Sequence, residues 1–516
     1  MTIISRTYRK RIRLGVTNYL DRNRGKMVVE IVLEKQAQAE AAADSDQYKF
    51  PFSSMGDKVR NHFKRGIEMK KTKRIGWVVW PIILFPMLIP SVVYADWGDI
   101  LSRIQVYGGV QETYDSNVNL TPTNKKDDYI TTVSLGFRLS TLPRSETTGE
   151  FQEPSTSEET KYGVFLDFLP GYVIYAKRTN DNYLSLSGNL DSWYTWDKKL
   201  TFRLKDYLIR SEEPLEQSYA ATALPGQILL GNQRGRAIYV RNVVQPSLEY
   251  RLGREDIISI NYMNNVYRNQ DDVRFEDSTE NYINPKLAYW FDIRNGISLE
   301  YALDLGNFQR SPDMTGNMGR GRYTYRFNPN TSIFGEFTFQ GRVFEKQISI
   351  PATDYNIYQP TIGFEHAFSP TLSLSAQFGY FWEIPRNGSS ETGPVYNIVV
   401  TQRARRTTYT LGFQGGYTED YYTAENLGFA KYHQVIGTIT HQLMERLFVT
   451  FSARYQRPNY NDGRVDNIWG VTTGASYRLL RWLALALDFS YSEDHSNREL
   501  NNYTDYRGIF RITATY

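Results

Sequence analysis

From about residue 100 to residue 516, apolar and polar side chains alternate with a period of two. In the segment 482–491 (WLALALDFSY), the odd-numbered positions are large and apolar, and the even-numbered positions from 484 on are small or polar. The segments 447–456, 297–306 and 372–382 repeat this pattern. A period of two predicts β-strands that turn one apolar face toward a hydrophobic environment.

The connections between these segments alternate between tight and long. The tight turns lie near residues 197–199, 253–255, 294–296, 328–330, 369–370, 444–446 and 480–481. The longer polar stretches are 212–235, 269–279, 307–315, 345–354, 384–392, 419–427, 458–465 and 493–502. Short turns on one side and longer loops on the other are typical of a barrel in the outer membrane of a Gram-negative bacterium.

We therefore predict an all-β fold, a closed antiparallel transmembrane β-barrel of about 20 strands, within a range of 16 to 22. The strands are expected to begin near residues 103, 127, 161, 183, 200, 236, 256, 281, 296, 315, 331, 354, 371, 393, 405, 428, 446, 465, 481 and 502. The segment 393–401 is included partly because the alternation of turns requires it. An even number of strands places both barrel termini in the periplasm.

The hydrocarbon of the membrane requires the predicted sheet to close into a barrel. Hydrocarbon offers no hydrogen bonds, so only helices and closed barrels can span it, and no helix-length apolar run follows residue 95. The soluble alternatives are a β-propeller, a β-sandwich array and a β-solenoid. A propeller would repeat a fixed motif every ~40–50 residues, and none is visible.

The last strand carries a further signal. Phe510, Ile512, Ala514 and Tyr516 share one strand face, and the final residue is aromatic. This arrangement resembles the C-terminal signal that the barrel-assembly machinery reads, with Tyr where Phe is commoner. That machinery, together with outer-membrane lipid and lipopolysaccharide, is an expected partner.

Composition agrees with this picture. The mean hydropathy of −0.50 excludes a polytopic helical membrane protein, and averages an apolar outer face with polar interior and loops. The 39 Tyr predict aromatic girdles at the two membrane interfaces. The chain has no Cys, which excludes disulfide frameworks, cysteine-zinc sites and thiol nucleophiles.

The net charge of +4 divides unevenly along the chain. Residues 1–74 contain 18 Lys and Arg against 8 Asp and Glu, which leaves 42 basic and 48 acidic residues for the rest. A nucleic-acid partner is therefore not expected. The basic run that starts at Met69 precedes 21 uncharged residues, 75–95, which end in a small-x-small pattern. We interpret residues 69–95 as a signal peptide, cleaved between Ala95 and Asp96.

The alternative for residues 75–95 is a transmembrane anchor, which three prolines in the segment weaken. A signal peptide belongs at an N-terminus, so residues 1–68 are expected to be a misassigned start or a disordered extension. In a translated extension, Lys26 to Ala43 would form a short amphipathic helix. The barrel domain is assigned to residues 96–516.

Two stretches resemble a known family. Glu112 to Val118 (ETYDSNV) is followed by an acidic-aromatic start to the second strand, 127–130, and residues 421–430 (YYTAENLGFA) form a late loop. These sequence motifs are similar to those of the outer-membrane β-barrel porins of the second type, a family often linked to exopolysaccharide and PEP-CTERM surface systems. The resemblance implies a barrel and a polysaccharide or export complex as partner. It supplies no catalytic residues.

Charged positions on the polar strand faces are the candidate channel lining. They are Arg203, Lys205, Glu300, Asp304, Glu336, Arg342, Arg454, Asp488, Arg507 and Arg511. Opposed charges across a pore can tune selectivity, whereas ladders of ion pairs would stiffen the wall. The sequence leaves both interpretations open.

Enzyme signatures are weak, and we expect neither catalysis nor a cofactor or metal. Asp494-His495 and Asp271-Asp272 lie in predicted loops, where they could belong to a rim hydrolase. Asn461-Asp462-Gly463 with Asp466 could hold calcium, although a solvated turn is the commoner use of such residues. The glycine-rich segment 316–321 only imitates a nucleotide fingerprint, because strand glycines more often mark bends.

The function expected from the sequence is that of a porin-like outer-membrane channel, which passes hydrophilic solute or assists exopolysaccharide export. The first alternative is a structural or docking barrel that binds surface polysaccharide. The second is the rim hydrolase, in which Asp494 would be essential.

Overall fold

The computed structural model describes residues 13–21, 26–34, 103–141, 161–212, 237–270, 275–345, 353–422 and 427–516. The chain divides into two units, residues 1–93 and 94–516. The expected signal peptide, 69–95, and its cleavage site at Ala95 and Asp96 lie outside the described residues. None of the helices among the described residues is long and apolar enough to cross a membrane.

The first unit contains one antiparallel hairpin. Strand β1 (Arg13–Asp21) pairs with β2 (Lys26–Glu34) in a register that joins Arg13 to Glu34. The helix expected from Lys26 is therefore wrong over residues 26–34. Four of these nine residues are Val or Ile, whose branched side chains lose rotamer freedom in a helix and pack well on a pleated sheet.

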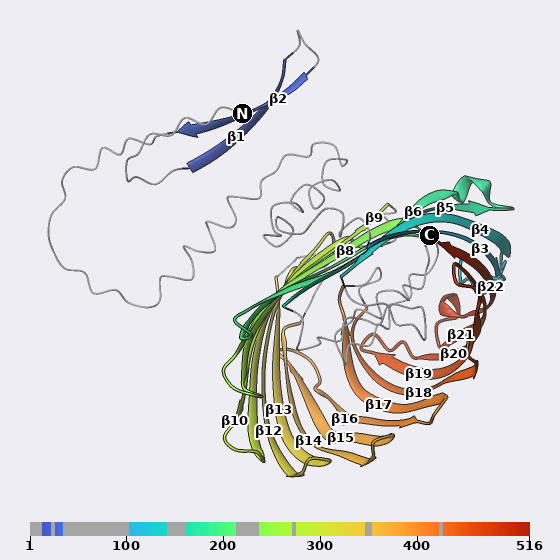
Figure 1. Ribbon diagram of the computed structural model, residues 1–516. Coiled ribbons are helices and arrows are strands. Elements are labelled where there is room, and N and C mark those ends of the chain that lie inside the picture. The colour runs from blue at the N-terminus through green and yellow to red at the C-terminus, as the bar shows by residue number, and fades with distance from the viewer. Residues whose placement is uncertain are drawn as a thin grey trace. The chain divides into compact units, whose positions relative to one another are not determined.

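The second unit is a closed antiparallel barrel of 20 strands, β3 to β22 (Figure 1). Each strand pairs with its neighbours along the chain, and β22 pairs with β3 to close the ring. The strands are β3 (Ile104–Asp115), β4 (Asp128–Ser140), β5 (Tyr162–Tyr175), β6 (Tyr183–Trp196), β7 (Leu200–Ser211), β8 (Tyr239–Arg251), β9 (Ile257–Asn269), β10 (Ser278–Trp290), β11 (Asn295–Phe308), β12 (Met314–Asn328), β13 (Thr331–Phe344), β14 (Tyr355–Ser369), β15 (Leu372–Pro385), β16 (Glu391–Arg403), β17 (Thr407–Asp420), β18 (Gly428–Met444), β19 (Leu447–Tyr460), β20 (Asp466–Leu480), β21 (Leu483–Ser496) and β22 (Tyr503–Thr515).

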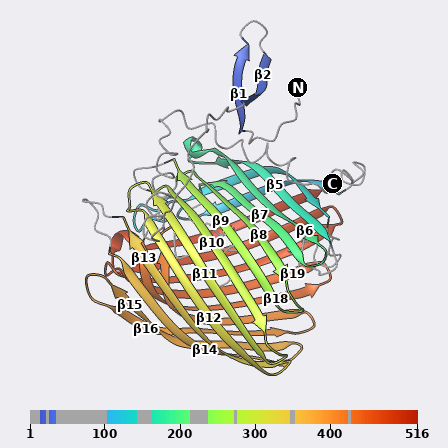
Figure 2. The ribbon, with the colours of Figure 1, turned by 90° about the vertical axis from the view of Figure 1, so that its left-hand side faces the viewer.

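The predicted fold and strand count are confirmed, including the strand placed at 393–401 on grounds of alternation. The tilted strands run between two ends, as the side view of Figure 2 shows. We call the end that holds the tight connections the turn end; these connections are 197–199, 252–256, 291–294, 329–330, 370–371, 404–406, 445–446 and 481–482. The opposite end is the loop end. The first residues of β3 and the last of β22 both lie at the turn end.

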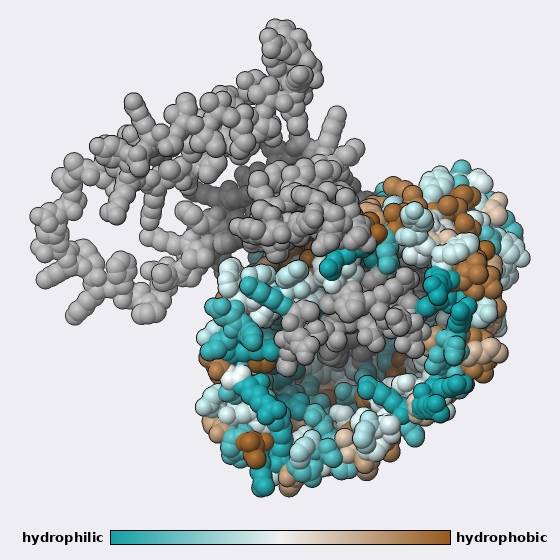
Figure 3. Space-filling model, in the orientation of Figure 1, coloured by the Kyte–Doolittle hydropathy of each residue, from teal (hydrophilic) through white to brown (hydrophobic). Residues whose placement is uncertain are grey.

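Alternate residues of each strand form an apolar outer face. Leu135, Leu299, Phe337, Ile362 and Leu487 lie near the middle of their strands and are at least half exposed. Their sequence neighbours are polar, charged or small and form the interior face. Figure 3 shows hydrophilic residues around the opening of the ring and hydrophobic residues along parts of its outer edge. This division is what a closed barrel in hydrocarbon requires.

Exposed aromatic residues gather in two bands on the outer face. The band near the turn end contains Tyr162, Trp196, Tyr250, Phe291, Phe327, Phe368 and Trp482. The band near the loop end contains Tyr114, Tyr129, Tyr172, Trp382, Trp469 and Tyr506. Their positions match the expected girdles.

A second set of tyrosines departs from that expectation, because they are buried at the loop end. These are Tyr175, Tyr183, Tyr239, Tyr267, Tyr355, Tyr460 and Tyr503. They end or begin strands on the interior side. The tyrosine excess thus has two causes, outer girdles and a packed interior at the loop end.

Placing a charge on the outer face should destabilise the barrel. Phe337 is half exposed at the middle of β13, so Phe337→Arg would place a guanidinium in the hydrocarbon, at a cost of about 2–4 kcal/mol. Urea unfolding of the barrel in lipid bilayers measures this cost. The matched control is Glu336→Arg, one residue away on the interior face, where a charge stays in polar surroundings. Equal destabilisation by both variants would contradict the assignment of the two faces.

Candidate functional site

The wall of the barrel is incomplete between β16 and β17 at the loop end. The ladder between these strands runs from Arg403↔Thr408 to Tyr396↔Gly415 and ends there. Residues 391–395 of β16 continue to pair with β15, and residues 416–420 of β17 continue to pair with β18. The last five residues of β17 have therefore left the wall on the side of β16. We call residues 416–422 the β17 end.

Gly416 marks the point of departure. Its φ of +152° lies in a region that L-residues with a side chain rarely adopt, so glycine permits the bend here. Before the bend, Leu411 and Phe413 point to the outer face. After it, Tyr417 and Glu419, which share their parity, contact interior residues of β13 and β15. The β17 end therefore lies inside the barrel, against the inner surface of its own wall.

A network of ion pairs holds the β17 end in this position. Glu419 accepts two hydrogen bonds from the Arg342 guanidinium of β13, at 2.9 Å from Nε and 2.6 Å from Nη2. The Tyr355 hydroxyl of β14 donates a third bond, at 2.5 Å, to the same carboxylate. Arg342 and Glu419 each expose only 11% of their side chains. Each charge of this bidentate pair depends on the other, because a single charge removed from water without a partner would lower the stability of the protein.

A glycine makes room for the same arginine. Gly316 on β12 pairs with Arg342 on one side and with Asp304 of β11 on the other. A Cβ atom at position 316 would stand 1.9 Å from Arg342 Nη1. Without it, Arg342 reaches over β12 and lies 3.6 Å from Asp304. One glycine of the segment 316–321 therefore makes room for the network.

Aromatic rings fill the space between the β17 end and the wall. Tyr355, Ile357, Phe381 and Phe429 form a buried cluster, with Tyr417 and Tyr421 packed against it. The ring centroids of Phe381 and Tyr417 are 5.0 Å apart. Such pairs are worth about 0.5–1.5 kcal/mol beyond the area that they bury. Apolar packing and ion pairs therefore fix the same segment.

Tyr422 extends the β17 end across the barrel. Its hydroxyl donates to Asp304 at 2.6 Å, its ring stacks on Phe308, and its carbonyl oxygen accepts a 2.9 Å bond from Arg241 of β8. Strands β8 and β17 are separated by eight strands on one side and by ten on the other. The bond between Arg241 and Tyr422 therefore bridges nearly opposite parts of the wall and divides the interior at the loop end.

Tyr422 is protonated over the whole neutral range. Burial raises its pKa well above the ordinary value, and the negative charges of Asp304 and Glu280 raise it further. A raised tyrosine pKa means that the contribution of the bond to Asp304 is present below the ordinary pKa and is lost only as pH rises through the raised one. The Tyr422 hydroxyl therefore keeps the proton that it donates to Asp304 at neutral pH. Burial likewise raises the pKa of Tyr421.

A cavity of about 450 Å³ opens beside the β17 end on its loop side. Its lining combines aromatic rings with carboxylates and amides. It includes Phe308, Phe344, Tyr355, Tyr421 and Phe429 together with Glu383, Glu391, Asn387 and Asn461.

The structure places the ten predicted lining residues on interior strand faces, and brings only some of them together. Asp304 and Arg342 meet in the network, whereas Glu300 pairs with Arg320 at 3.3 Å. Further contacts join Arg203 to Asp191, Glu336 to Gln377, Arg507 to Asp115 and Arg511 to Gln111. Lys205, Arg454 and Asp488 form no ion pair with any residue that the structure describes. Four of the ten, Arg203, Glu300, Arg507 and Arg511, therefore contact a neighbouring strand, and Asp304, Glu336 and Arg342 reach across an intervening strand. That these residues line a channel remains a prediction.

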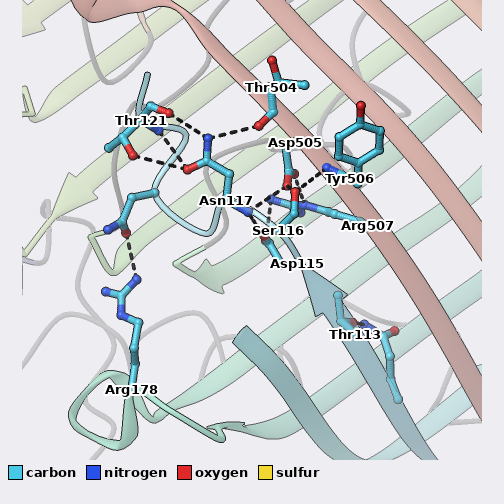
Figure 4. Close-up of polar contacts among 12 residues, drawn as sticks. Thr113, Asp115, Ser116, Asn117, Thr121, Arg178, Thr504, Asp505, Tyr506 and Arg507 are labelled. Carbon is cyan, nitrogen blue, oxygen red and sulfur yellow. Dashed lines mark hydrogen bonds and ion pairs between the residues drawn. The ribbon is translucent and has the colours of Figure 1, made fainter. Parts of the chain in front are cut away.

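A second polar cluster closes the barrel between β3 and β22 (Figure 4). We call it the seam cluster: Asp115, Ser116, Asn117, Asp505 and Arg507. Arg507 lies 3.1 Å from Asp115 and 2.8 Å from Asp505, and Asp505 also accepts bonds from Ser116 and from the backbone of Asn117. Asn117 is fully buried and donates to the carbonyl oxygens of Thr121 and Thr504. The Asp-Ser-Asn sequence at residues 115–117 thus joins the first strand of the barrel to the last.

The enzyme and metal motifs weighed as alternatives do not assemble where the structure describes them. Asp494 lies on the interior face of β21 and its neighbour His495 on the opposite face, because adjacent strand residues point to opposite sides. Asp271 and Asp272 lie outside the described residues. Asp466 is paired with Arg464, and Gly463, with a φ of +81°, forms a turn. Within the described ranges, no group of three His, Asp or Glu side chains could hold a metal ion.

Sequence reasoning missed the residues at the centre of the site. Glu419, Tyr421 and Tyr422 fell in the predicted loop 419–427, and Arg241 was not singled out. The available signal was the Gly415-Gly416 pair within a strand, since glycine in a strand marks a bend or a close approach of backbones.

Part of the chain is similar to a known protein family. Residues 308–516 match the family described as "Putative beta-barrel porin 2". A comparison with curated proteins returns no match.

Similar solved structures include OccAB2 of Acinetobacter baumannii, at 11% identity and a TM-score of 0.36, covering 80% of this chain and 98% of that one. The outer membrane protein opdK of Pseudomonas aeruginosa has 10% identity and a TM-score of 0.38, covering 80% and 99%. The ferric citrate transporter FecA in the unliganded form has 10% identity and a TM-score of 0.43, covering 80% and 78%.

The family match confirms the resemblance noted in the sequence, and it covers all strands from β12 to β22. The loop sequence 421–430 lies within the matched range, whereas Glu112 to Val118 lies outside it. Residues 308–516, which hold strands β12 to β22, are therefore similar to the family described as "Putative beta-barrel porin 2", and the second unit as a whole has the closed antiparallel fold of 20 strands.

Proposed function

We propose that this protein is an outer-membrane channel for hydrophilic solutes, with both barrel termini in the periplasm. The observation that carries the proposal is the division of the closed barrel into an apolar outer face and an interior face of charged and amide side chains. A strand that faces lipid on one side and water on the other has this composition.

The β17 end is the proposed constriction of this channel. Glu419, Arg342, Asp304 and Tyr422 bring both signs of charge together inside the barrel. Charged side chains at a narrow point act on passing ions more strongly than charges on a wide wall. The aromatic and carboxylate lining of the neighbouring cavity suits hydroxyl-rich solutes. A saccharide chain moving outward, as in exopolysaccharide export, is therefore one candidate cargo.

Planar-bilayer recording of the purified full chain tests the channel. We expect discrete conductance steps in salt solution, because a polar interior in a closed wall admits water and ions. A barrel that conducts nothing, either as the natural protein or after the network around Arg342 is removed, would contradict the proposal. That result would favour a structural barrel that binds polymer at its loops.

A further inference from the structure

We propose that the β17 end is a gate, which leaves the interior and joins the wall by completing its ladder with β16. The proposal rests on the proposed channel function and adds its regulation. Among the described residues, the β17 end lies inside the barrel, and the ladder between β16 and β17 is not formed over residues 391–395 and 416–420.

The two edges match in length and register. Continuing the ladder beyond Tyr396↔Gly415 would pair residue 395 with 416, and so on, until Glu391 meets Asp420. Glu391 is the first residue of β16, and Asp420 is the last of β17. Two strands that bend apart midway, yet end at partner positions, have the lengths that a complete ladder requires.

The unformed part of the ladder has a cost that the complete ladder would remove. A membrane protein tolerates an open strand edge only where water or other groups of the protein bond its backbone N–H and C=O groups. Pro394, which has no amide hydrogen, lies in this part of β16 and reduces the number of donors that need such a partner. The interior position is therefore supported, but the wall position remains accessible to the same residues.

The contacts that hold the gate shut fall into separable groups. On the interior side they are the Arg342–Glu419 pair with the Tyr355 bond, the aromatic cluster with the Tyr417 bond to Gln340, and the contacts of Tyr422 with Asp304, Phe308 and Arg241. On the other side, Lys431 of β18 reaches past β17 and pairs with Glu391 of β16 at 2.5 Å. This pair spans the gap in the wall and must break when the β17 end moves into it. Both side chains are about one-third exposed, so the loss is modest.

The side chains of the β17 end suit both positions. In the wall, Tyr417 and Glu419 would point outward like Leu411 and Phe413 of the same strand. They would then lie at the loop end of the outer face, where the tyrosine and tryptophan band lies. An aromatic ring is favoured at that interface. When the β17 end leaves the interior, the bond between Tyr422 and Arg241 is lost and the interior becomes wider.

Cysteine cross-linking tests the movement directly, because the natural chain has no cysteine. In Glu391→Cys/Asp420→Cys, the two residues become partners only in the complete ladder, where Cα atoms lie about 4.5–5.5 Å apart, within the range for a disulfide. The positive control is Asn397→Cys/Gln414→Cys, whose positions are already paired and whose natural side chains are hydrogen-bonded. Each single-cysteine variant serves as a negative control.

We expect mild oxidation of the full-length protein in lipid vesicles to cross-link both double variants. The control should react at once and Glu391→Cys/Asp420→Cys more slowly, as shown by a band shift on a non-reducing gel. In bilayers, the cross-linked Glu391→Cys/Asp420→Cys protein should conduct more than its reduced form, and reduction should reverse the gain. The pair Thr392→Cys/Glu419→Cys tests the neighbouring register position should the first variant not fold.

Absence of a cross-link in both test pairs, under conditions that fully cross-link the control, would overturn the gate. A cross-link that leaves the conductance unchanged would overturn it as well. The gel reports strand movement even in a protein that conducts nothing, so a failed channel proposal is distinguishable from a failed gate.

Discussion

Arg342→Met is expected to destabilise the barrel by about 3–5 kcal/mol, because it leaves two carboxylates inside the protein without their cation. Glu419 loses both bonds of its bidentate pair, and Asp304 loses a charge 3.6 Å away. The methionine keeps most of the side-chain volume, so the effect is electrostatic. The midpoint of urea unfolding in lipid bilayers measures the change. The same variant should raise the single-channel conductance, because the main anchor of the β17 end is gone.

Two comparisons make the test specific. Glu419→Gln in the Arg342→Met background should recover part of the stability, because removing both partners leaves fewer buried charges without a partner. Arg386→Met breaks an exposed pair with Asp354, in which the arginine side chain is 67% exposed, and should cost about 1 kcal/mol or less. If Arg342→Met were no more harmful than Arg386→Met, the network would not hold the β17 end.

Arg507→Met is expected to weaken the closure of the barrel by a similar amount, about 3–5 kcal/mol, through the seam cluster. Asp115 and Asp505 each expose 1% of their side chains and both face Arg507. Their charges would then repel each other between the first and last strands. We expect a lower unfolding midpoint and a smaller fraction of the compact form on unheated gels, with no gain in conductance.

The matched control for the seam is Arg511→Met. Arg511 lies on the same face of β22 but is exposed, and its side chain donates to the neutral side chain of Gln111 at 3.0 Å. Its loss should cost about 1 kcal/mol or less. Equal shifts of the unfolding midpoint in the two variants would show that the seam cluster contributes no more than a surface contact.

Much of the barrel could be predicted from sequence, because hydrocarbon imposes a strict alternation on every strand. Leu483, Leu485 and Leu487 can face lipid in only one register, so strand count, direction and interior faces follow from pattern alone. Even the start of β16, whose pattern is weak, followed from the need to alternate turns and loops.

The inward bend of the β17 end could not be predicted, because Tyr417 and Tyr421 keep the parity of the outward residues Leu411 and Phe413, although Glu419 interrupts the pattern. Tyr417 and Tyr421 occupy positions that would face the membrane in a regular strand, and an aromatic residue suits either lipid or a neighbouring wall. What decides between them is the Arg342 side chain of β13, 77 residues away from Glu419 along the chain. The predicted helix from Lys26 was wrong over residues 26–34 for a different reason, because four of these nine residues are β-branched and favour a strand.

Closure through the seam cluster also fixes an order of assembly. Nineteen of the twenty ladders join strands that are consecutive in the chain, and each can form as its hairpin is made. The remaining ladder brings Ser116 to Asp505, 389 residues apart, and it cannot exist before the last strand does. Until then the chain is an open sheet with two free edges, each able to pair with a foreign strand. A chain interrupted before residue 503 would therefore remain a substrate for aggregation and proteolysis, however well its other hairpins had formed.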